Sequence, residues 1–232
     1  MNVLLWKDYR LCRPVLIVGA ALWAAPFLAL IAFGFYLRAR YGEGGQWLSV
    51  HWEMCGVISL GLSVFTIAML AGEAFATERN DRSADFLAYL PISLRMNLIS
   101  KGIWALGPSL LIWGLNLLII FVLVPAFAPS ATAEVTAQDG SAAVPVAVLA
   151  AVSVLAFGGA WCFSTFMSNH ALAMFCGILS PFILGLLLQS LSFGLGITWL
   201  TETARPFEEL AWGLGIVTIV GGSIYYLRRI TP

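Results

Sequence analysis

The chain has 232 residues, of which 60% are hydrophobic and only 10% are charged, and its mean hydropathy is +0.91. A soluble domain of this length needs more charge to cover its surface. Its 12 basic and 12 acidic side chains balance, so no positive excess indicates nucleic-acid binding and no acidic excess predicts a solvating tail. The composition therefore predicts a multi-pass membrane protein.

The first 13 residues are too polar to cross a membrane and too apolar for a disordered tail. A helix lying in the membrane interface, with Trp6 and Tyr9 at headgroup depth, is the preferred interpretation of residues 1–13. The alternative is a simple basic flank that sets the topology.

Six apolar blocks follow, each long enough to cross about 30 Å of hydrocarbon as a helix. Backbone groups in lipid must bond within their own segment, so we expect helices throughout. The predicted fold is a single all-α transmembrane domain over residues 1–232, with spans at about 15–37, 54–76, 102–125, 144–167, 171–193 and 210–227. Pro26, Pro108 and Pro181 fall inside spans, where prolines kink helices or lie near their ends.

The positive-inside rule predicts the orientation of these spans. With a cytoplasmic N-terminus, the inner side carries Lys7, Arg10, Arg13, Arg79, Arg82, Arg95, Lys101, Arg228 and Arg229. The opposite side carries only Arg38, Arg40 and Arg205. We therefore expect a protein of the cell (inner) membrane with both termini in the cytoplasm.

Residues 78–101, between the second and third spans, form a charged segment in an otherwise apolar chain. Asp81 or Ser83 is placed to cap a short helix, and Asp85 in its first turn suits the positive end of the helix dipole. Pro91 ends that helix, because the residue before a proline avoids the helical region. A short helix of about two turns is predicted, and an ordinary hydrated hairpin is the alternative.

After this break, Ser93 is placed to cap a second helix that runs through Arg95 and Lys101 into the third span. A short helix between two spans could be pushed from outside, and the force would reach both spans through continuous helix.

The segment resembles the cytoplasmic loop of type-2 ABC exporter permeases, membrane subunits whose ATPase is often a separate chain. The family pattern is a glutamate, a threonine or serine, a leucine-containing short helix, Leu-Pro, valine or isoleucine, serine, and a lysine at the next span. The matching residues are Glu78, Ser83, Leu87, Leu90, Pro91, Ile92, Ser93 and Lys101. Arg82 departs from the pattern, because a glycine is common there. The six-span layout, the N-terminal helix and the irregular stretch 189–209 are also similar to the family.

The resemblance implies a coupling helix, residues 81–90, that docks into a groove of an ABC ATPase subunit against which residues 1–13 also rest. The implied ATPase contacts are Arg79, Asp81, Arg82, Ser83, Asp85, Phe86, Leu87, Leu90 and Pro91. The implied assembly has two permease subunits, identical or related, and two ATPases that bind ATP and magnesium. The chain itself has no GxxxxGK[ST] loop for phosphates, so we expect ATP hydrolysis in the partner and neither enzyme activity nor a bound cofactor here.

Three polar side chains within the spans are candidates for function: Glu73, Asn116 and Gln189. A carboxylate in a membrane is costly and often functional, although Glu73 could also pair with Arg79 or Arg82. The two amides suit helix–helix hydrogen bonds or substrate contact. No span carries Lys or Arg at its middle, which disfavours an ion-driven transporter and favours an amphiphilic cargo. A membrane scaffold or sensor and an intramembrane enzyme are the alternative functions, and no metal site is expected.

Overall fold

The computed structural model of the chain describes residues 2–41, 45–80, 93–123, 143–195 and 204–229. In chain order its elements are α1 (Asn2–Tyr41), α2 (Gly45–Asn80), α4 (Leu94–Leu118), the π-helical turn η1 (Ile119–Leu123), α7 (Ala143–Ser164), α8 (His170–Leu195) and α10 (Arg205–Arg229). The described residues contain helices and no strand. Six of the helices are long and apolar enough to cross a membrane, which confirms the predicted all-α, multi-pass fold.

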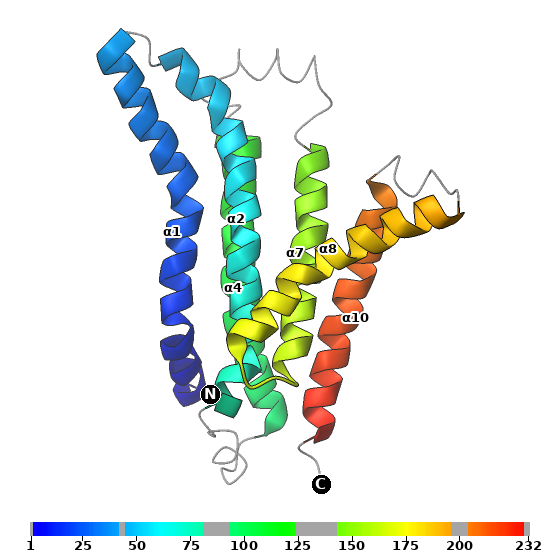
Figure 1. The fold of residues 1–232 in the computed structure, drawn as a ribbon. Coiled ribbons are helices and arrows are strands. Elements are labelled where there is room, and N and C mark those ends of the chain that lie inside the picture. Colours follow the sequence, from blue (N-terminus) through cyan, green and yellow to red (C-terminus); the bar gives the residue numbers. More distant parts are fainter. Residues whose placement is uncertain (1, 42–44, 81–92, 124–142, 196–203, 230–232) are drawn as a thin grey trace.

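The ends of four helices lie together at one end of the bundle (Figure 1). There α1 begins, α2 ends, α4 begins and α10 ends, and we call this end the base of the bundle. Residues 81–92, which connect α2 to α4, lie outside the described residues. The coupling helix expected at 81–90 therefore stays a prediction, as does the assignment of the base to the cytoplasm.

Two helices form the centre of the bundle. In α2 and α7, 56% of the most apolar stretch is buried inside the protein, against 28% or less in the other four helices. Phe75 of α2 packs its ring against Trp161 of α7 and Tyr226 of α10, with ring centroids 4.8 and 4.5 Å apart. Aromatic pairs at this separation add to the apolar contact, so this cluster joins three helices near the base.

Small residues let α7 approach its neighbours closely. At Gly215 of α10, a Cβ atom would lie 2.8 Å from the carbonyl oxygen of Val154 in α7. At Gly177 of α8, it would lie 2.6 Å from the carbonyl oxygen of Ala156. Lipid chains are as apolar as the helix surfaces, so helices associate in a membrane through close packing of this kind.

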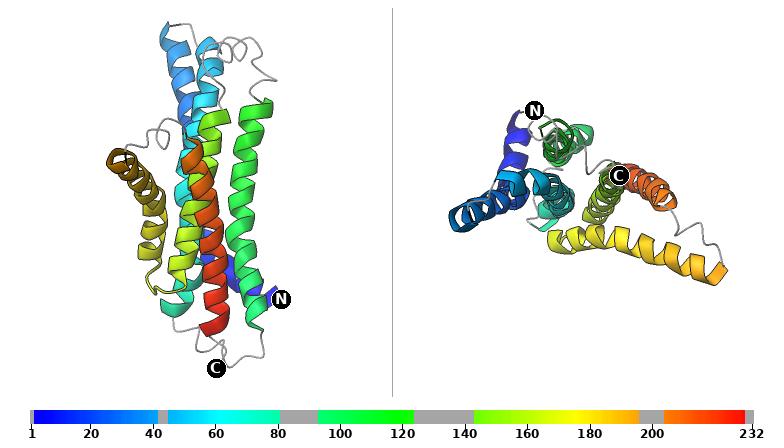
Figure 2. Two further views of the ribbon diagram at one scale, coloured as in Figure 1. Left: turned by 90° about the vertical axis from the view of Figure 1, so that its right-hand side faces the viewer. Right: turned by 90° about the horizontal axis from the view of Figure 1, so that it is seen from above.

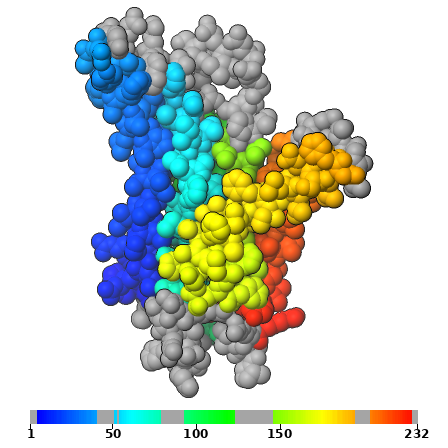
Figure 3. Space-filling view, viewed as in Figure 1, coloured from blue at the N-terminus to red at the C-terminus, as the bar shows by residue number. Residues whose placement is uncertain are grey.

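The helix α8 crosses the bundle obliquely instead of running beside its neighbours (Figures 1 and 2). It lies over α2 and α7 (Figure 3). Leu184 and Leu188 pack against Ala211 of α10 and a buried patch of α7, whereas Phe182 and Phe193 are exposed. The stretch predicted to be irregular is partly helical, because α8 continues to Leu195 and α10 already begins at Arg205.

Two local predictions can be compared with the structure. Residues 2–13 are helical, but they are the first turns of α1 and not a separate helix. Figure 2 shows these turns running in a different direction from the rest of α1, and Pro14 follows them directly. Ser93 caps α4 as predicted, because its side chain accepts a hydrogen bond from the backbone N–H of Met96.

A pair of glycines on α10 tests the importance of close packing. Gly215→Ala is expected to lower the free energy of unfolding by about 1–3 kcal/mol, because its methyl group overlaps the backbone of Val154. Gly213→Ala, two residues away, meets nothing within 4 Å and serves as the matched control. Thermal unfolding in detergent, followed by size-exclusion chromatography, measures the difference. Equal Tm values for the two variants would contradict close α7–α10 packing.

Candidate functional site

Three charged side chains from three helices meet at the base of the bundle. A carboxylate oxygen of Glu78, in the last turn of α2, accepts a hydrogen bond from the Lys7 ammonium of α1. The ammonium nitrogen of Lys101, in α4, lies 3.1 Å from the same oxygen. The side chains of Glu78 and Lys101 are only 4% and 3% exposed, and that of Lys7 is 30% exposed. We call these three residues the Glu78 cluster.

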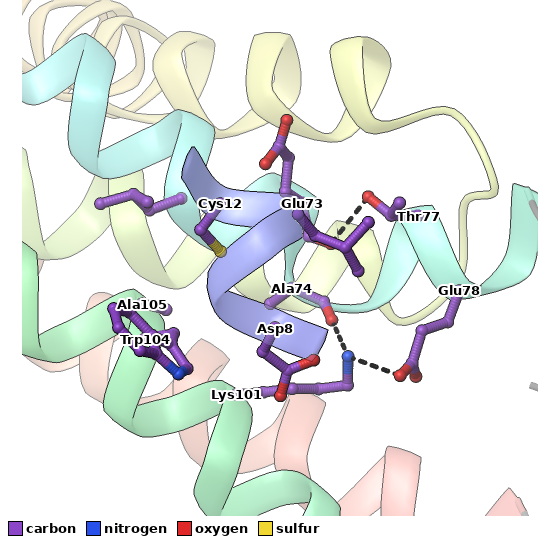
Figure 4. A pocket seen from close by; sticks show the side chains of 11 residues that line it. Asp8, Cys12, Glu73, Ala74, Thr77, Glu78, Lys101, Trp104 and Ala105 are labelled. Carbon is purple, nitrogen blue, oxygen red and sulfur yellow. Dashed lines mark hydrogen bonds and ion pairs between the residues drawn. The ribbon is translucent and has the colours of Figure 1, made fainter. Parts of the chain in front are cut away.

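The Lys101 ammonium has further contacts with α2. It donates a hydrogen bond to the backbone carbonyl of Ala74 (Figure 4), and it lies 5.4 Å from the centroid of the Phe75 ring. Ala74 and Glu78 are four residues apart, so both face the same side of α2. The lysine therefore combines an ion pair, a hydrogen bond and a cation–π contact, each of which offsets part of the cost of removing its charge from water.

The first turns of α1 are held against α4 by polar and aromatic contacts. The hydroxyl of Ser100 donates a 2.6 Å hydrogen bond to the buried Asp8 carboxylate. The ring of Tyr9 packs against Trp104, with centroids 5.2 Å apart. Tyr9 thus faces α4, and of the two aromatic residues predicted at headgroup depth only Trp6 is strongly exposed.

A small pocket opens beside the Glu78 cluster, lined by residues of α1, α2 and α4 that include Asp8, Cys12, Glu73 and Trp104 (Figure 4). About 20 Å³ is open to the centre of a water-sized sphere, and roughly 10–15 Å³ is enough for one water molecule. Figure 4 shows the Glu73 carboxylate pointing away from Lys101. One of its oxygens is buried without a hydrogen-bond partner among the described residues.

The chemistry of this site is structural and electrostatic. A buried carboxylate is stable only when it is paired, and here two cations from different helices pair with one anion. Among the described residues, no group of three His, Cys, Asp or Glu side chains is placed to hold a metal ion. The cluster therefore acts as a tie that fixes α1 and α4 to the end of α2.

The predicted ATPase-contact residues lie between Glu78 and Lys101 in the sequence. Asp81, Arg82, Ser83, Asp85, Phe86, Leu87, Leu90 and Pro91 lie outside the described residues, and Arg79 belongs to the last turn of α2 with its side chain not described. Glu78 is directly before the first residue of this set, Arg79, and Ser93 is two residues after its last, Pro91. Their role stays a prediction, but the helix ends on both sides of the segment meet at the base.

The three predicted intramembrane polar residues do not form one site. Ile120 of η1 lies against Gly56, which places Asn116, one turn earlier, about 20 Å from Glu73 along the antiparallel α2. Asn116 is fully buried and its amide donates to the carbonyl of Ile112 within α4, so it is enclosed by neighbouring helices. Gln189 is exposed on α8.

Sequence analysis did not predict the contacts of Lys7 or Asp8. Lys7 enters that analysis only as one of the basic residues of the inner side, and Asp8 has no role in it. Asp8 is the only acidic residue before Glu43, and it is four residues before the buried Cys12. A lone acid in register with an apolar face indicates a polar partner on a neighbouring helix, but only the fold identifies Ser100 as that partner.

Comparison with known proteins finds no match to this chain, whether with family models, with curated proteins or with solved structures. The resemblance to ABC exporter permeases therefore rests on the residues of the 78–101 segment and on the order of the spans.

Removal of the shared anion tests the tie. Glu78→Gln is expected to lower the free energy of unfolding by about 3–5 kcal/mol, because it leaves two cations beside each other and one of them buried. Thermal unfolding in detergent measures the loss. Glu209→Gln, which removes an exposed carboxylate from α10, is the control and should leave the Tm nearly unchanged. A Glu78→Gln protein as stable as the control would show that the cluster contributes nothing to the fold.

Proposed function

We propose that this chain is the transmembrane permease subunit of an ATP-driven ABC exporter, coupled to a separate ATPase subunit. The observation that carries the proposal is the Glu78 cluster. It joins the first turns of α1, the end of α2 and the first turns of α4 at one end of the bundle. The resemblance assigns these same three segments to the side that faces the ATPase.

The geometry of the base supports the transmission of a displacement from residues 81–92, where the ATPase is proposed to bind, to the helices α1, α2 and α4. The segment 81–92 enters and leaves the bundle through α2 and α4, which are 36 and 25 residues long. A displacement of the segment would move both helix ends, and the Glu78 cluster would make α1 follow. Since α2 packs against α7, α8, α4 and α1, motion of its end would reach most of the bundle. Rocking of packed helices about such a joint is a usual form of alternating access.

The proposed assembly contains a second permease subunit and two ATPases, with ATP and magnesium bound in the ATPases. Its membrane is the cell (inner) membrane, and the base faces the cytoplasm, in agreement with the distribution of Lys and Arg. An amphiphilic substrate suits helices whose described buried residues include Ser59, Ser63 and Thr66 among apolar neighbours. A scaffold or sensor that docks a cytoplasmic partner through 78–101 is the alternative, and it is an outcome of the first test.

Docking of the ATPase is the first prediction of this proposal. Affinity purification from native membrane in mild detergent should recover an ATPase with the wild-type chain. The Phe86→Asp, Leu90→Asp double variant should lose at least 90% of it, because two charges replace the apolar anchors of the predicted helix. Quantitative immunoblotting or mass spectrometry of the eluate, with the purified ATPase assayed for hydrolysis, measures recovery.

The matched control is a Phe121→Asp, Val122→Asp variant, since both residues are exposed at the far end of α4 and η1. It should insert less well, but the inserted fraction should still bind the ATPase. Recovery of a partner without ATPase activity would favour the scaffold or sensor. Recovery of no partner with intact wild-type protein would refute the exporter proposal.

Coupling, as distinct from docking, depends on the Glu78 cluster. Lys7→Gln is expected to leave ATPase recovery unchanged, because the Glu78–Lys101 pair remains in place. It should reduce by several-fold the change in ATPase rate that the permease causes in proteoliposomes, because α1 no longer follows α2. The control is Arg38→Gln, at the opposite end of α1. Equal rates for wild type, Lys7→Gln and Arg38→Gln would exclude a coupling role for Lys7.

A further inference from the structure

The outer face of the first turns of α1 carries a short cationic stripe. Arg10 and Arg13 are exposed, and Trp6, one turn before Arg10, is 60% exposed. The opposite face, with Asp8 and Cys12, is buried against α2 and α4. Residues three and four positions apart lie on the same side of a helix, so Trp6, Arg10 and Arg13 form one continuous surface, which we call the Trp6 stripe.

No carboxylate within the described part of the chain neutralises the Trp6 stripe. Neither arginine forms an ion pair there, and the ion pairs of this region belong to Lys7 and Lys101. The acid nearest in sequence, Asp8, is buried and accepts a hydrogen bond from Ser100. Among the described residues, the charge that these turns expose is therefore entirely positive, and a surface of this charge attracts anions.

The Trp6 stripe ends where the apolar outer face of α1 begins. Ile17 and Val18 are both exposed, and Ile17 lies one turn, about 6 Å, beyond Arg13 along the helix. Exposed aliphatic side chains on a membrane-length helix face lipid chains. Arg13 and Arg10 lie one and two turns outside this face, and Trp6 lies three turns outside it. Because these turns run in a different direction from the rest of α1 (Figure 2), they suit the headgroup region, where tryptophan and basic residues flank a span.

We infer that the Trp6 stripe binds the headgroup of an anionic phospholipid, with the guanidinium groups of Arg10 and Arg13 on the phosphate and Trp6 beside the glycerol region. Arginine presents two parallel N–H donors that match a phosphate. A zwitterionic headgroup would bring its own cation next to the two arginines, whereas phosphatidylglycerol would not. The site lies on the face of α1 opposite Asp8 and Cys12, so a bound lipid and the contacts with α2 and α4 would hold these turns from two sides.

The inference requires no ATPase and is tested without one. Purified protein is incubated with equimolar phosphatidylglycerol and phosphatidylcholine, and bound lipids are counted by native mass spectrometry. Wild type should retain phosphatidylglycerol preferentially. The Arg10→Gln, Arg13→Gln variant should lose this preference by on the order of tenfold, since each basic residue near an anionic surface contributes several-fold. Arg38→Gln, Arg40→Gln, at the other end of α1, is the matched control with the same charge change and should keep the preference.

Three outcomes would overturn the inference. They are equal retention of the two lipids by wild type, an equal loss in the Arg38 and Arg40 control, and displacement of phosphatidylglycerol by millimolar inorganic phosphate, which would indicate a site for free anions. If the double variant does not fold, judged by its Tm, Trp6→Ala replaces it, because this exposed residue supports no buried contact of the Glu78 cluster. Unchanged lipid preference in Trp6→Ala would then count against the site.

Discussion

The arrangement of the base depends on one requirement, that a carboxylate buried away from water must be paired. Glu78 is at the end of α2 and nearly inaccessible, and its partners come from α1 and α4. If both lysines were absent, the carboxylate would bear a desolvation cost that apolar packing does not offset. The relative positions of three helix ends are therefore fixed by electrostatics, at the point where the chain leaves the bundle for residues 81–92.

Two kinds of contact hold the helices together, and they are distributed unequally. The contacts of α7 with α8 and α10 are made mainly by glycines, alanines and aromatic rings, with one hydrogen bond to each helix, from Ser180 of α8 to the Leu155 carbonyl and from Trp161 to Ser223 of α10. The contacts of α1 and α4 near the base include ion pairs and hydrogen bonds, to which Asn97 of α4 adds a 2.8 Å bond to the Tyr226 hydroxyl of α10. Close apolar packing has few alternative arrangements, whereas the partly exposed Lys7 ammonium can exchange its carboxylate partner for water at lower cost. The structure thus combines closely packed helices with a buried polar junction at the base, in which Lys7 is the most exposed member of the Glu78 cluster.

The sequence was informative where physical constraints act locally. The lengths of the apolar blocks predicted six helices, because backbone groups in lipid must bond within their own segment. The serine that follows Pro91 and Ile92 predicted the cap of α4 at Ser93, because the first backbone N–H groups of a helix need a side-chain acceptor. It was uninformative about contacts between segments distant in the chain. Glu78 and Lys101 were identified only through the family resemblance. The position of Asp8 indicates a polar partner, but nothing in the first 13 residues identifies α2 and α4 as the helices that Lys7 and Asp8 contact. The oblique path of α8 also depends on packing that composition does not encode.

The depth of the Glu78 cluster bears on whether it can serve as a moving joint. An ion pair at the middle of a membrane could not separate, because each charge would then stand alone in hydrocarbon. Here the pair lies at the helix ends, and Lys7 keeps part of its surface exposed. In the proposed movement of α1, the Lys7 ammonium would exchange Glu78 for water or for a lipid phosphate, while Lys101 would continue to neutralise the carboxylate. Two cations on one anion therefore allow one contact to open while the buried charge remains paired, and this is the property that a repeatedly moving helix junction requires.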